Sequence, residues 1–355
     1  MAGGRAKIAE GRPRARLATG GYEIIAERSP RLLPAGARDM LAGSFAGMKT
    51  ICIWLVLAVW LAHAAPAGAQ VFRVATFNVE NYVEDPASRR PLKPAAARAK
   101  VCESIVALKP DVIALQEMGS TNALMELQGA LKKSGLDLPF WDHITGSDTN
   151  IHLALLSRFP IASRHPHTNE TYLLGGRRFY VSRGFMEDEI KVNTNYKFTL
   201  IAGHLKSKMP SGIADEQEWR EEEAVVLRRI IDARLASDPE ERLVVLGDLN
   251  DTQDSRTMKS ILGRGKTSLF DTRPAERRGG STGPQTTGAP AQPRRTTWTD
   301  FYAKEDSYGR LDYILISHGL QRDWRGEETY ILNLPDWGVA SDHRPLVAGF
   351  MATGK

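Results

Sequence analysis

Eight short apolar runs constrain the fold of this chain more than any other feature of its sequence. Their length and their content of β-branched and aromatic residues predict β-strands. Helical patterns are predicted over 94–108, 121–133 and 214–236. No helical pattern separates the strands between 152 and 207, which indicates antiparallel pairing in part of a mixed α/β fold. The runs are VFRVATFNV (71–79), DVIALQEM (111–118), HLALLSRFPI (152–161), RFYVSRGFMEDEI (178–190), KFTLIAGHLKS (197–207), RLVVLGDLN (242–250), LDYILIS (311–317) and PLVAGFM (345–351).

The N-terminal segment resembles a secretory signal peptide. From Met48 the chain reads MKTICIWLVLAVWLAHAAPAGAQ, with one Lys, twelve apolar residues and a small-residue AGA site, so we expect export and cleavage before Gln70. A membrane anchor is the alternative, but twelve apolar residues fall short of the roughly twenty that a bilayer requires.

The domain boundaries follow from this reading of the N-terminus. Residues 48–69 are the predicted signal peptide and residues 70–355 the predicted domain. Residues 1–47 are either a disordered extension or the product of a wrongly assigned start. The Gly-, Pro- and Thr-rich segment 279–295 is predicted to be a mobile surface loop within the domain.

The positive charge of the chain lies mostly outside the predicted domain. Residues 1–70 contain nine Lys and Arg and four Asp and Glu, which leaves 38 of each in residues 71–355 from totals of 47 and 42. The net charge of the domain therefore gives no support to nucleic-acid binding, although a local basic patch is compatible with it.

Polar residues follow the apolar runs at positions that favour one shared site. Four of the predicted strands carry polar residues at or near the carboxyl end, and two carry them at or just before the amino end. Strands of opposite direction would therefore place all of these side chains at one edge of the sheets. Taken alone, the Asp–Leu–Asn sequence at 248–250 is equally typical of a polar turn. Strand alternation predicts that Asp248 and Asn250 share one side. The converging residues are Asn78, Glu117, His204, Asp248, Asn250, Asp312, Asp342 and His343.

These residue types favour phosphoryl chemistry assisted by a hard cation. Carboxylates and amides suit Mg²⁺ or Mn²⁺, and the chain has no Cys or His cluster with the spacing of a zinc site. It also lacks a G-x-S-x-G elbow and a phosphate-binding glycine loop. Asp312 begins a strand that is apolar on both faces, so this carboxylate needs a partner, and His343 is the candidate.

The motifs ATFNVEN, PDVIALQE, GHLKS, LGDLND, GRLDYILIS and SDHRP resemble those of the endonuclease/exonuclease/phosphatase superfamily, in the same order, over about residues 75–350. This superfamily includes deoxyribonucleases, apurinic endonucleases, neutral sphingomyelinases and inositol polyphosphate 5-phosphatases. The resemblance implies a four-layer α/β sandwich with two packed mixed sheets. It also implies a site at one edge of those sheets.

The resemblance also implies a role for each residue. Glu117 would be the main metal ligand, with Asn78 and Asp342 beside it. Asp248 would deprotonate the attacking water and Asn250 would hold the water or a phosphate oxygen. Asp312 would pair with His343 at the scissile phosphate, and His204 would assist the phosphate or the leaving group. Asn78 and Arg183 would also contact the substrate phosphate.

We therefore expect an exported Mg²⁺- or Mn²⁺-dependent phosphodiesterase of the nuclease type, acting on DNA or RNA as a monomer without a stable membrane anchor. A phosphomonoester or a phospholipid head group is the alternative substrate. The alternative outside the enzymes is a catalytically inert binding protein. This alternative is disfavoured because no catalytic position is visibly replaced. The sequence leaves open whether the substrate is DNA, RNA, a lipid or a small ester, and whether a nucleic acid would be cut internally or from its ends.

Overall fold

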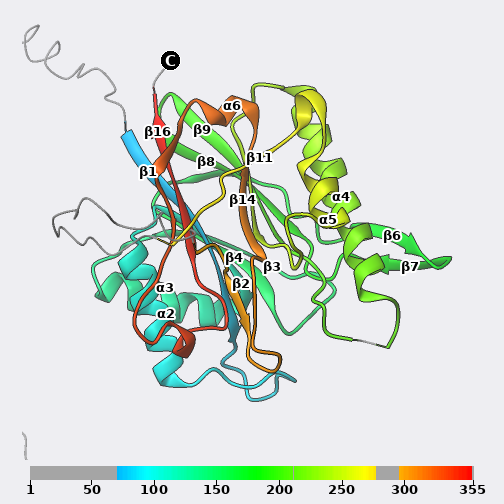
Figure 1. Cartoon of the computed structure of the whole chain (residues 1–355). Helices are drawn as coiled ribbons and strands as arrows, with labels where there is room; N and C mark the ends of the chain where they lie inside the picture. Colours follow the sequence, from blue (N-terminus) through cyan, green and yellow to red (C-terminus); the bar gives the residue numbers. More distant parts are fainter. Residues whose placement is uncertain (1–69, 211, 277–295, 354–355) are drawn as a thin grey trace, which may run out of the picture. The chain divides into compact units, whose positions relative to one another are not determined.

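Two six-stranded β-sheets form the framework of residues 70–210, 212–276 and 296–353, which the computed structural model describes (Figure 1). Sheet A has the order β15 (Trp324–Ile331), β16 (Leu346–Ala352), β1 (Gln70–Tyr82), β2 (Val112–Met118), β4 (His152–Ser157) and β3 (Phe140–Ile144). Sheet B has the order β11 (Phe270–Asp271), β14 (Asp312–Ile316), β10 (Leu243–Asp248), β9 (Tyr196–His204), β8 (Phe185–Asn193) and β5 (Ile161–Arg164). Two small hairpins pair β6 (Thr171–Leu174) with β7 (Arg177–Tyr180) and β12 (Asp300–Tyr302) with β13 (Ser307–Gly309).

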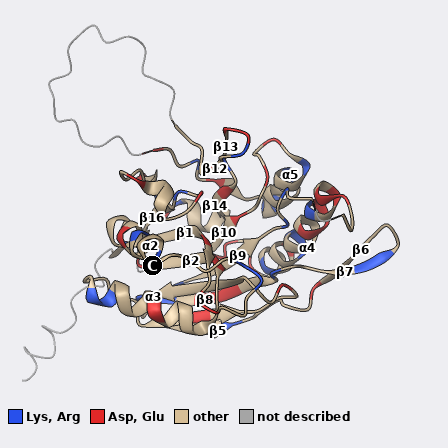
Figure 2. Cartoon of the chain, turned by 90° about the horizontal axis from the view of Figure 1, so that it is seen from below, with Lys and Arg blue, Asp and Glu red and all other residues tan. Residues whose placement is uncertain are grey.

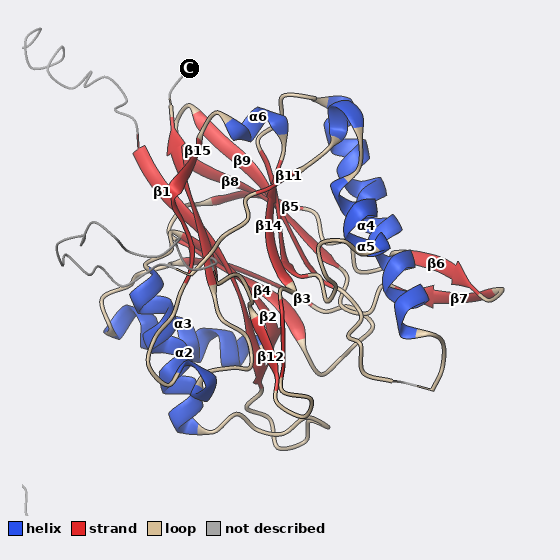
Figure 3. Ribbon diagram, in the orientation of Figure 1, coloured by secondary structure: helices blue, strands red, loops and turns tan. Residues whose placement is uncertain are grey.

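Helices cover the outer face of each sheet (Figure 3). The helices α2 (Ala95–Leu108) and α3 (Thr121–Lys133) pack on sheet A, and α4 (Glu216–Ser237) and α5 (Arg256–Leu262) pack on sheet B. A short helix, α6 (His318–Gln321), follows β14. The layers run helix, sheet, sheet, helix, which confirms the predicted four-layer α/β sandwich.

Alternation along β1 shows how the strands build two cores at once. Phe72 and Val74 face sheet B and belong to the central core, whereas Ala75 and Phe77 face α2 and α3. The strand is therefore apolar on both sides, as expected for a strand buried between two layers. The same alternation directs the polar side chain of Asn78, which ends this series, toward the central face between the sheets.

The predicted strand directions are confirmed. In sheet A, β1 pairs with β2 in parallel and with β16 in antiparallel fashion. In sheet B, β10 pairs with β9 in parallel and with β14 in antiparallel fashion. The carboxyl ends of β1, β2, β9 and β10 therefore lie at the same edges as the amino ends of β14 and β16.

The predicted strand over 178–190 was wrong. The run 178–190 is not one strand, because it is broken at residues 181–184 between hairpin strand β7 and sheet strand β8. Gly184 has a φ of 68°, and a Cβ there would lie 2.8 Å from the carbonyl oxygen of His167. The predicted signal peptide, the segment 1–47 and the loop 279–295 lie outside the described residues.

Candidate active site

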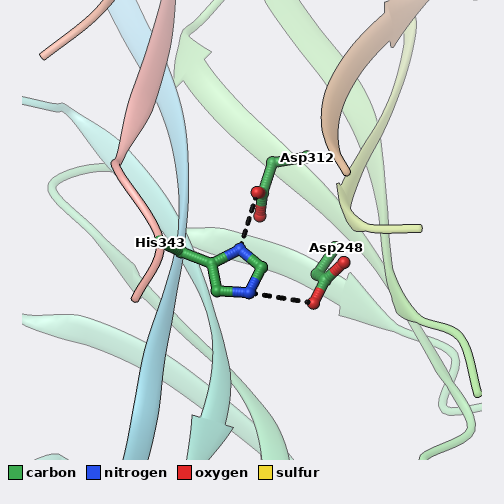
Figure 4. Close-up of side chains that lie close together, drawn as sticks. All are labelled: Asp248, Asp312 and His343. Atoms are coloured by element: carbon green, nitrogen blue, oxygen red, sulfur yellow. Dashed lines mark hydrogen bonds and ion pairs between the residues drawn. The ribbon is translucent and has the colours of Figure 1, made fainter. Parts of the chain in front are cut away.

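The centre of the site is a hydrogen bond between side chains from the two sheets (Figure 4). His343 precedes β16 in sheet A, and its Nδ1 lies 2.8 Å from Oδ2 of Asp312, at the start of β14 in sheet B. The other ring nitrogen, Nε2, faces Oδ2 of Asp248 at 3.7 Å. The pairing that the sequence predicted for the buried Asp312 is therefore present, and it fixes which nitrogen of His343 is directed toward Asp248.

The histidines on either side of Asp248 have opposite electrostatic environments. Burial alone would lower the pKa of His343, but Asp312 and Asp248 raise it well above its usual value. Burial, assisted by the charge of Arg183, lowers the pKa of His204 well below its usual value, although its Nε2 lies only 3.6 Å from Asp248. The surroundings thus favour the charged form of one imidazole and the neutral form of the other around one carboxylate.

Asp248 is suited to exchange a proton near neutral pH. Burial raises its pKa to about 7, against the opposing charge of His343. Its Oδ2 accepts a hydrogen bond from Nδ2 of Asn78 at 3.0 Å, and its Oδ1 accepts one from the backbone N–H of Asn250 at 3.0 Å. These two bonds leave little freedom for the carboxylate to rotate, which is the requirement for a positioned base.

Asn78 contacts both Asp248, the predicted base, and Glu117, the predicted metal ligand. Its Nδ2 lies 3.0 Å from Asp248 and 3.5 Å from Oε1 of Glu117. Its backbone carbonyl accepts a hydrogen bond from Ser341 Oγ at 2.8 Å, and the same hydroxyl accepts one from the backbone N–H of His343. One asparagine therefore fixes the spacing between Asp248 and Glu117 and anchors the segment that carries His343.

Unusual backbone conformations direct two of the site side chains. Glu117 has a φ of 60° beside an irregularity in the pairing of β2 with β1, so it departs from the strand alternation that would point it outward. Asn250 has a φ of 53° and lies beyond the end of β10 at Asp248. Strand alternation therefore does not position Asn250, whose backbone N–H donates to Oδ1 of Asp248, and the expectation that the two side chains share one side stays a prediction. Positive φ at non-glycine residues is costly and is concentrated at functional sites.

Gly247 allows two strands of sheet B to approach closely at the site. Its φ is 134°, and a Cβ there would lie 1.9 Å from the carbonyl oxygen of Gly203 in β9. Only glycine fits this contact. The close approach places the next residue pair, Asp248 and His204, directly opposite each other in the parallel register.

Two groups of acidic residues around His343 offer ligand atoms for a cation. Asp248, Asp312 and His343 each present one atom within 4.8 Å of the others, and so do Asp300, Asp342 and His343. The first group is buried and is consistent with a divalent metal site. Asp342, which was predicted to lie on the metal side, belongs to the second group.

The predicted ligands Glu117 and Asp342 also fit a hard cation. Burial raises the pKa of Asp342, and the negative charge of Glu117 acts in the same direction. Oε2 of Glu117 accepts a hydrogen bond from the backbone N–H of Asn81 at 2.9 Å, which holds the carboxylate in place. Two carboxylates that repel one another are the kind of oxygen donors that Mg²⁺ and Mn²⁺ prefer, whereas Asn78 turns its Nδ2 toward Glu117. The assignment of Asn78, Glu117 and Asp342 as ligands stays a prediction.

Arg183 lies beside the site, and its guanidinium is held by other groups. Nη1 donates to the carbonyl of Leu205 at 3.2 Å, and Nε lies 3.6 Å from Asp148. The same carbonyl of Leu205 accepts a hydrogen bond from Nδ2 of Asn250 at 3.1 Å. Arg183 therefore belongs to the network around His204 and Asn250, and its role toward substrate stays a prediction.

Two residues of the site have no signal in the sequence. Asp300, in β12, lies 3.4 Å from Nε2 of His343, and burial raises its pKa to about 6. Lys93 is almost fully buried, and its Nζ donates to the carbonyl of Glu80 at 2.8 Å. Asp300 follows the low-complexity segment and Lys93 precedes α2 in a Pro-rich stretch, so neither lies in a motif or at a strand end of the sheets.

The sequence pattern of the Endonuclease/Exonuclease/phosphatase family matches residues 75–343, a range that contains every residue of the site described above. The chain belongs to this family. It is therefore a phosphoester hydrolase whose buried Asp/His group is consistent with a divalent metal site. A search of curated protein sequences found no match.

Solved structures share this fold at low sequence identity. The human nocturnin catalytic domain has 16% identity and a TM-score of 0.52, covering 79% of this chain and 97% of its own. Sphingomyelinase C from Streptomyces griseocarneus has 18% identity and a TM-score of 0.53, with coverages of 79% and 99%. Truncated Caenorhabditis elegans TDP2 has 14% identity and a TM-score of 0.52, with coverages of 79% and 98%. None of the helices in the described ranges combines the length and apolar content that a bilayer crossing requires.

Proposed function

We propose that this family member is an exported, Mg²⁺- or Mn²⁺-dependent phosphodiesterase of the nuclease type, with DNA or RNA as its substrate. The observation that carries the proposal is the 2.8 Å hydrogen bond between Asp312 and Nδ1 of His343, which directs Nε2 of His343 toward the carboxylates of Asp248 and Asp300. A buried cation beside a carboxylate of raised pKa suits the spread negative charge of a phosphoryl transition state.

In this mechanism each side chain keeps the position described above. Asp248 accepts a proton from the attacking water, because its pKa lies near neutrality and Asn78 fixes its orientation. His343 contacts the scissile phosphate and neutralises its charge, and the neutral His204 donates a hydrogen bond to a phosphate oxygen or to the leaving group. A divalent cation held by Glu117, Asn78 and Asp342 would supply Lewis-acid polarisation of a phosphoryl oxygen.

A phospholipid head group is the second candidate substrate, and the β6–β7 hairpin is the observation that favours it. Leu173 and Tyr180 on this hairpin are 60% and 51% exposed. Arg177 and Arg178 give the same hairpin its positive charge (Figure 2). A projecting surface with apolar and basic side chains suits an anionic lipid interface, and one similar fold is that of a sphingomyelinase C.

A substrate panel with metal depletion tests the proposal. The protein is dialysed against a chelator and then assayed with single- and double-stranded DNA, RNA, a small phosphodiester, a phosphomonoester and sphingomyelin vesicles. We expect no turnover in the chelator, recovery with Mg²⁺ or Mn²⁺, and the fastest cleavage with a nucleic acid. Cleavage of the vesicles alone would favour the lipid candidate, and full activity in excess chelator would contradict the metal-dependent mechanism.

A further inference from the structure

A buried glutamate on helix α4 connects two segments that carry site residues. Glu223 has no exposed surface. Its Oε1 accepts hydrogen bonds from the backbone N–H and the hydroxyl of Ser182, at 2.9 and 2.8 Å. Its Oε2 accepts one from the backbone N–H of Lys206 at 2.7 Å. Both oxygens are therefore engaged, each by a different segment of the chain.

Each segment that Glu223 holds is adjacent to predicted site residues. Ser182 precedes Arg183, and Lys206 lies two residues after His204. The residue between His204 and Lys206 is Leu205, whose carbonyl accepts hydrogen bonds from both Arg183 and Asn250. A displacement of either segment would therefore move Arg183 relative to the Leu205 carbonyl, and with it the surroundings of His204.

A second residue of α4 supports the same segment from the same helix. Arg220 is also buried, and its Nη1 donates to the carbonyl of Lys206 at 3.1 Å. Glu223 thus holds the amide of Lys206 while Arg220, one turn earlier, holds its carbonyl. Helix α4 therefore fixes the two successive peptide units that flank the Cα of Lys206, although α4 itself contributes none of the predicted catalytic residues.

We propose that Glu223 is a positioning residue for hydrolysis: it fixes the segment that carries Arg183 against the segment that follows His204. The catalytic part of this inference rests on the proposed function, whereas the positional part does not. Small displacements at an active site lower turnover strongly, by about a hundredfold for a shift near 1 Å. A glutamate that merely stabilised α4 would have no specific link to Arg183.

The first experiment measures position without substrate. In the Glu223→Gln variant, the side-chain amide offers one acceptor oxygen and one donor group, so it can serve only one of the two segments. We expect amide hydrogen exchange at Ser182 or Lys206 to become about tenfold faster, because a hydrogen bond to a charged acceptor is lost. Glu218→Gln, an exposed position on the same helix, is the matched control and should leave both amides unchanged. Unchanged exchange in Glu223→Gln would overturn the proposal.

The second experiment asks whether this position matters for turnover. We expect Glu223→Gln to lower kcat by about ten- to a hundredfold on whichever phosphoester the wild-type protein hydrolyses. In the Arg183→Ala background, the same substitution should lower kcat by a factor at least about threefold smaller, since the effects of residues that act through one another are not additive. An equal loss in both backgrounds would show that Glu223 acts only through general stability and would overturn the positioning role.

Two further outcomes keep the test decisive. If Glu223→Gln does not fold, the Ser182→Ala variant replaces it. This change removes one of the three hydrogen bonds and keeps the buried carboxylate. We expect a smaller loss of kcat than for Glu223→Gln, and a loss that is smaller still in the Arg183→Ala background. Additive losses there would again contradict the proposal. If the wild-type protein hydrolyses no phosphoester, the proposed function fails, and the exchange measurement still decides whether Glu223 holds the two segments.

Discussion

At the scale of single residues, the site depends on the placement of His204 and His343 on either side of Asp248. Their Nε2 atoms lie 3.6 and 3.7 Å from the same oxygen, Oδ2 of Asp248. The pKa of His343 is raised by its acidic neighbours, whereas that of His204 is lowered by burial and nearby cations. The surroundings thus favour different protonation states in two identical side chains, which would let each contact a different oxygen of a phosphate.

Substitution of His343 or Asp248 should abolish most activity and leave the fold intact. We expect His343→Ala and Asp248→Asn each to lower kcat by about 10²- to 10⁴-fold, because each removes a charge or a base that acts in the transition state. Steady-state kinetics and thermal melts measure the two effects separately. His165→Ala and Asp254→Asn, at exposed positions, are the matched controls. Near wild-type rates in the first two variants would mean that these groups are structural only.

The sequence was sufficient to predict residues that lie in motifs at strand ends, and insufficient for residues placed by tertiary contact. Asn78, Asp248, Asp312 and His343 come together because strand direction and alternation determine where they point. Glu223 could not be predicted, because in a run of three glutamates no local pattern shows which one turns inward.

At the scale of elements, strand β8 contains an ionisable side chain in a position that is unfavourable for a charge. Asp188 is buried on β8. Neither of its oxygens accepts a hydrogen bond from the rest of the described chain. Burial, reinforced by the charge of Asp142, raises its pKa to about 8. Ionised carboxylates in such places oppose folding.

This pKa predicts that the protein loses stability as the pH rises. Between about pH 4, near the ordinary pKa of an aspartate, and pH 8, folded Asp188 keeps a proton that the unfolded chain releases, so the free energy of unfolding falls with rising pH over that window. Above pH 8 both states are ionised and the contribution is constant. We expect Asp188→Asn to raise Tm relative to wild type, more at pH 8 than at pH 5. Thermal melts across this range test it, with Asp254→Asn as control; a pH-independent difference would contradict the assignment.

Elements were predicted well where an apolar run was long enough to stand out. The three long helices and the central strands of both sheets match their predicted ranges closely, because their lengths and residue types distinguish helices from buried strands. Hairpin β6–β7 was not predicted, since each of its strands is only four residues long. In the sequence, β7 also runs into β8 within one run, with no long polar segment to mark the boundary. The turn at Gly184 that separates them depends on a contact with His167, which is distant in sequence.

At the scale of the whole molecule, the balance of charge limits how the protein can hold a polyanion. Residues 71–355 contain 38 basic and 38 acidic residues. The cations nearest the site are partly engaged: Arg183 lies 3.6 Å from Asp148, and Nζ of Lys206 donates to the carbonyls of Ser207 and Met209. The described surface therefore offers few free cations near the site for phosphate contacts.

The salt dependence of DNA cleavage should accordingly be shallow. Each phosphate neutralised on duplex DNA contributes a slope of about −0.9 in log K against log salt, so contacts from Arg183, Lys206 and Lys208 predict a slope no steeper than about −3. Hydrolysis of DNA of several lengths at rising salt concentration measures it, with a small phosphodiester as the comparison. A much steeper slope would reveal a basic face that the residue counts do not.

Export is the second prediction at this scale. The apolar run from Ile51 and the AGA site predict that the protein leaves the cytoplasm and is cut before Gln70. Mass spectrometry of the exported protein should find Gln70 as its first residue. Intact protein beginning at Met1 or Met48 in the cytoplasmic fraction would contradict both the localisation and the neutral charge of the mature domain.

Two of the hydrogen bonds that assemble the site cross from one sheet to the other. His343 of sheet A binds Asp312 of sheet B, and Asn78 of sheet A binds Asp248 of sheet B. A chain whose sheets have formed but have not yet docked has no base beside its cation and no amide to orient that base. If the proposed export precedes folding, the unfolded chain would carry no assembled site inside the cell, and hydrolysis of phosphoesters would begin only once the two sheets have docked outside it.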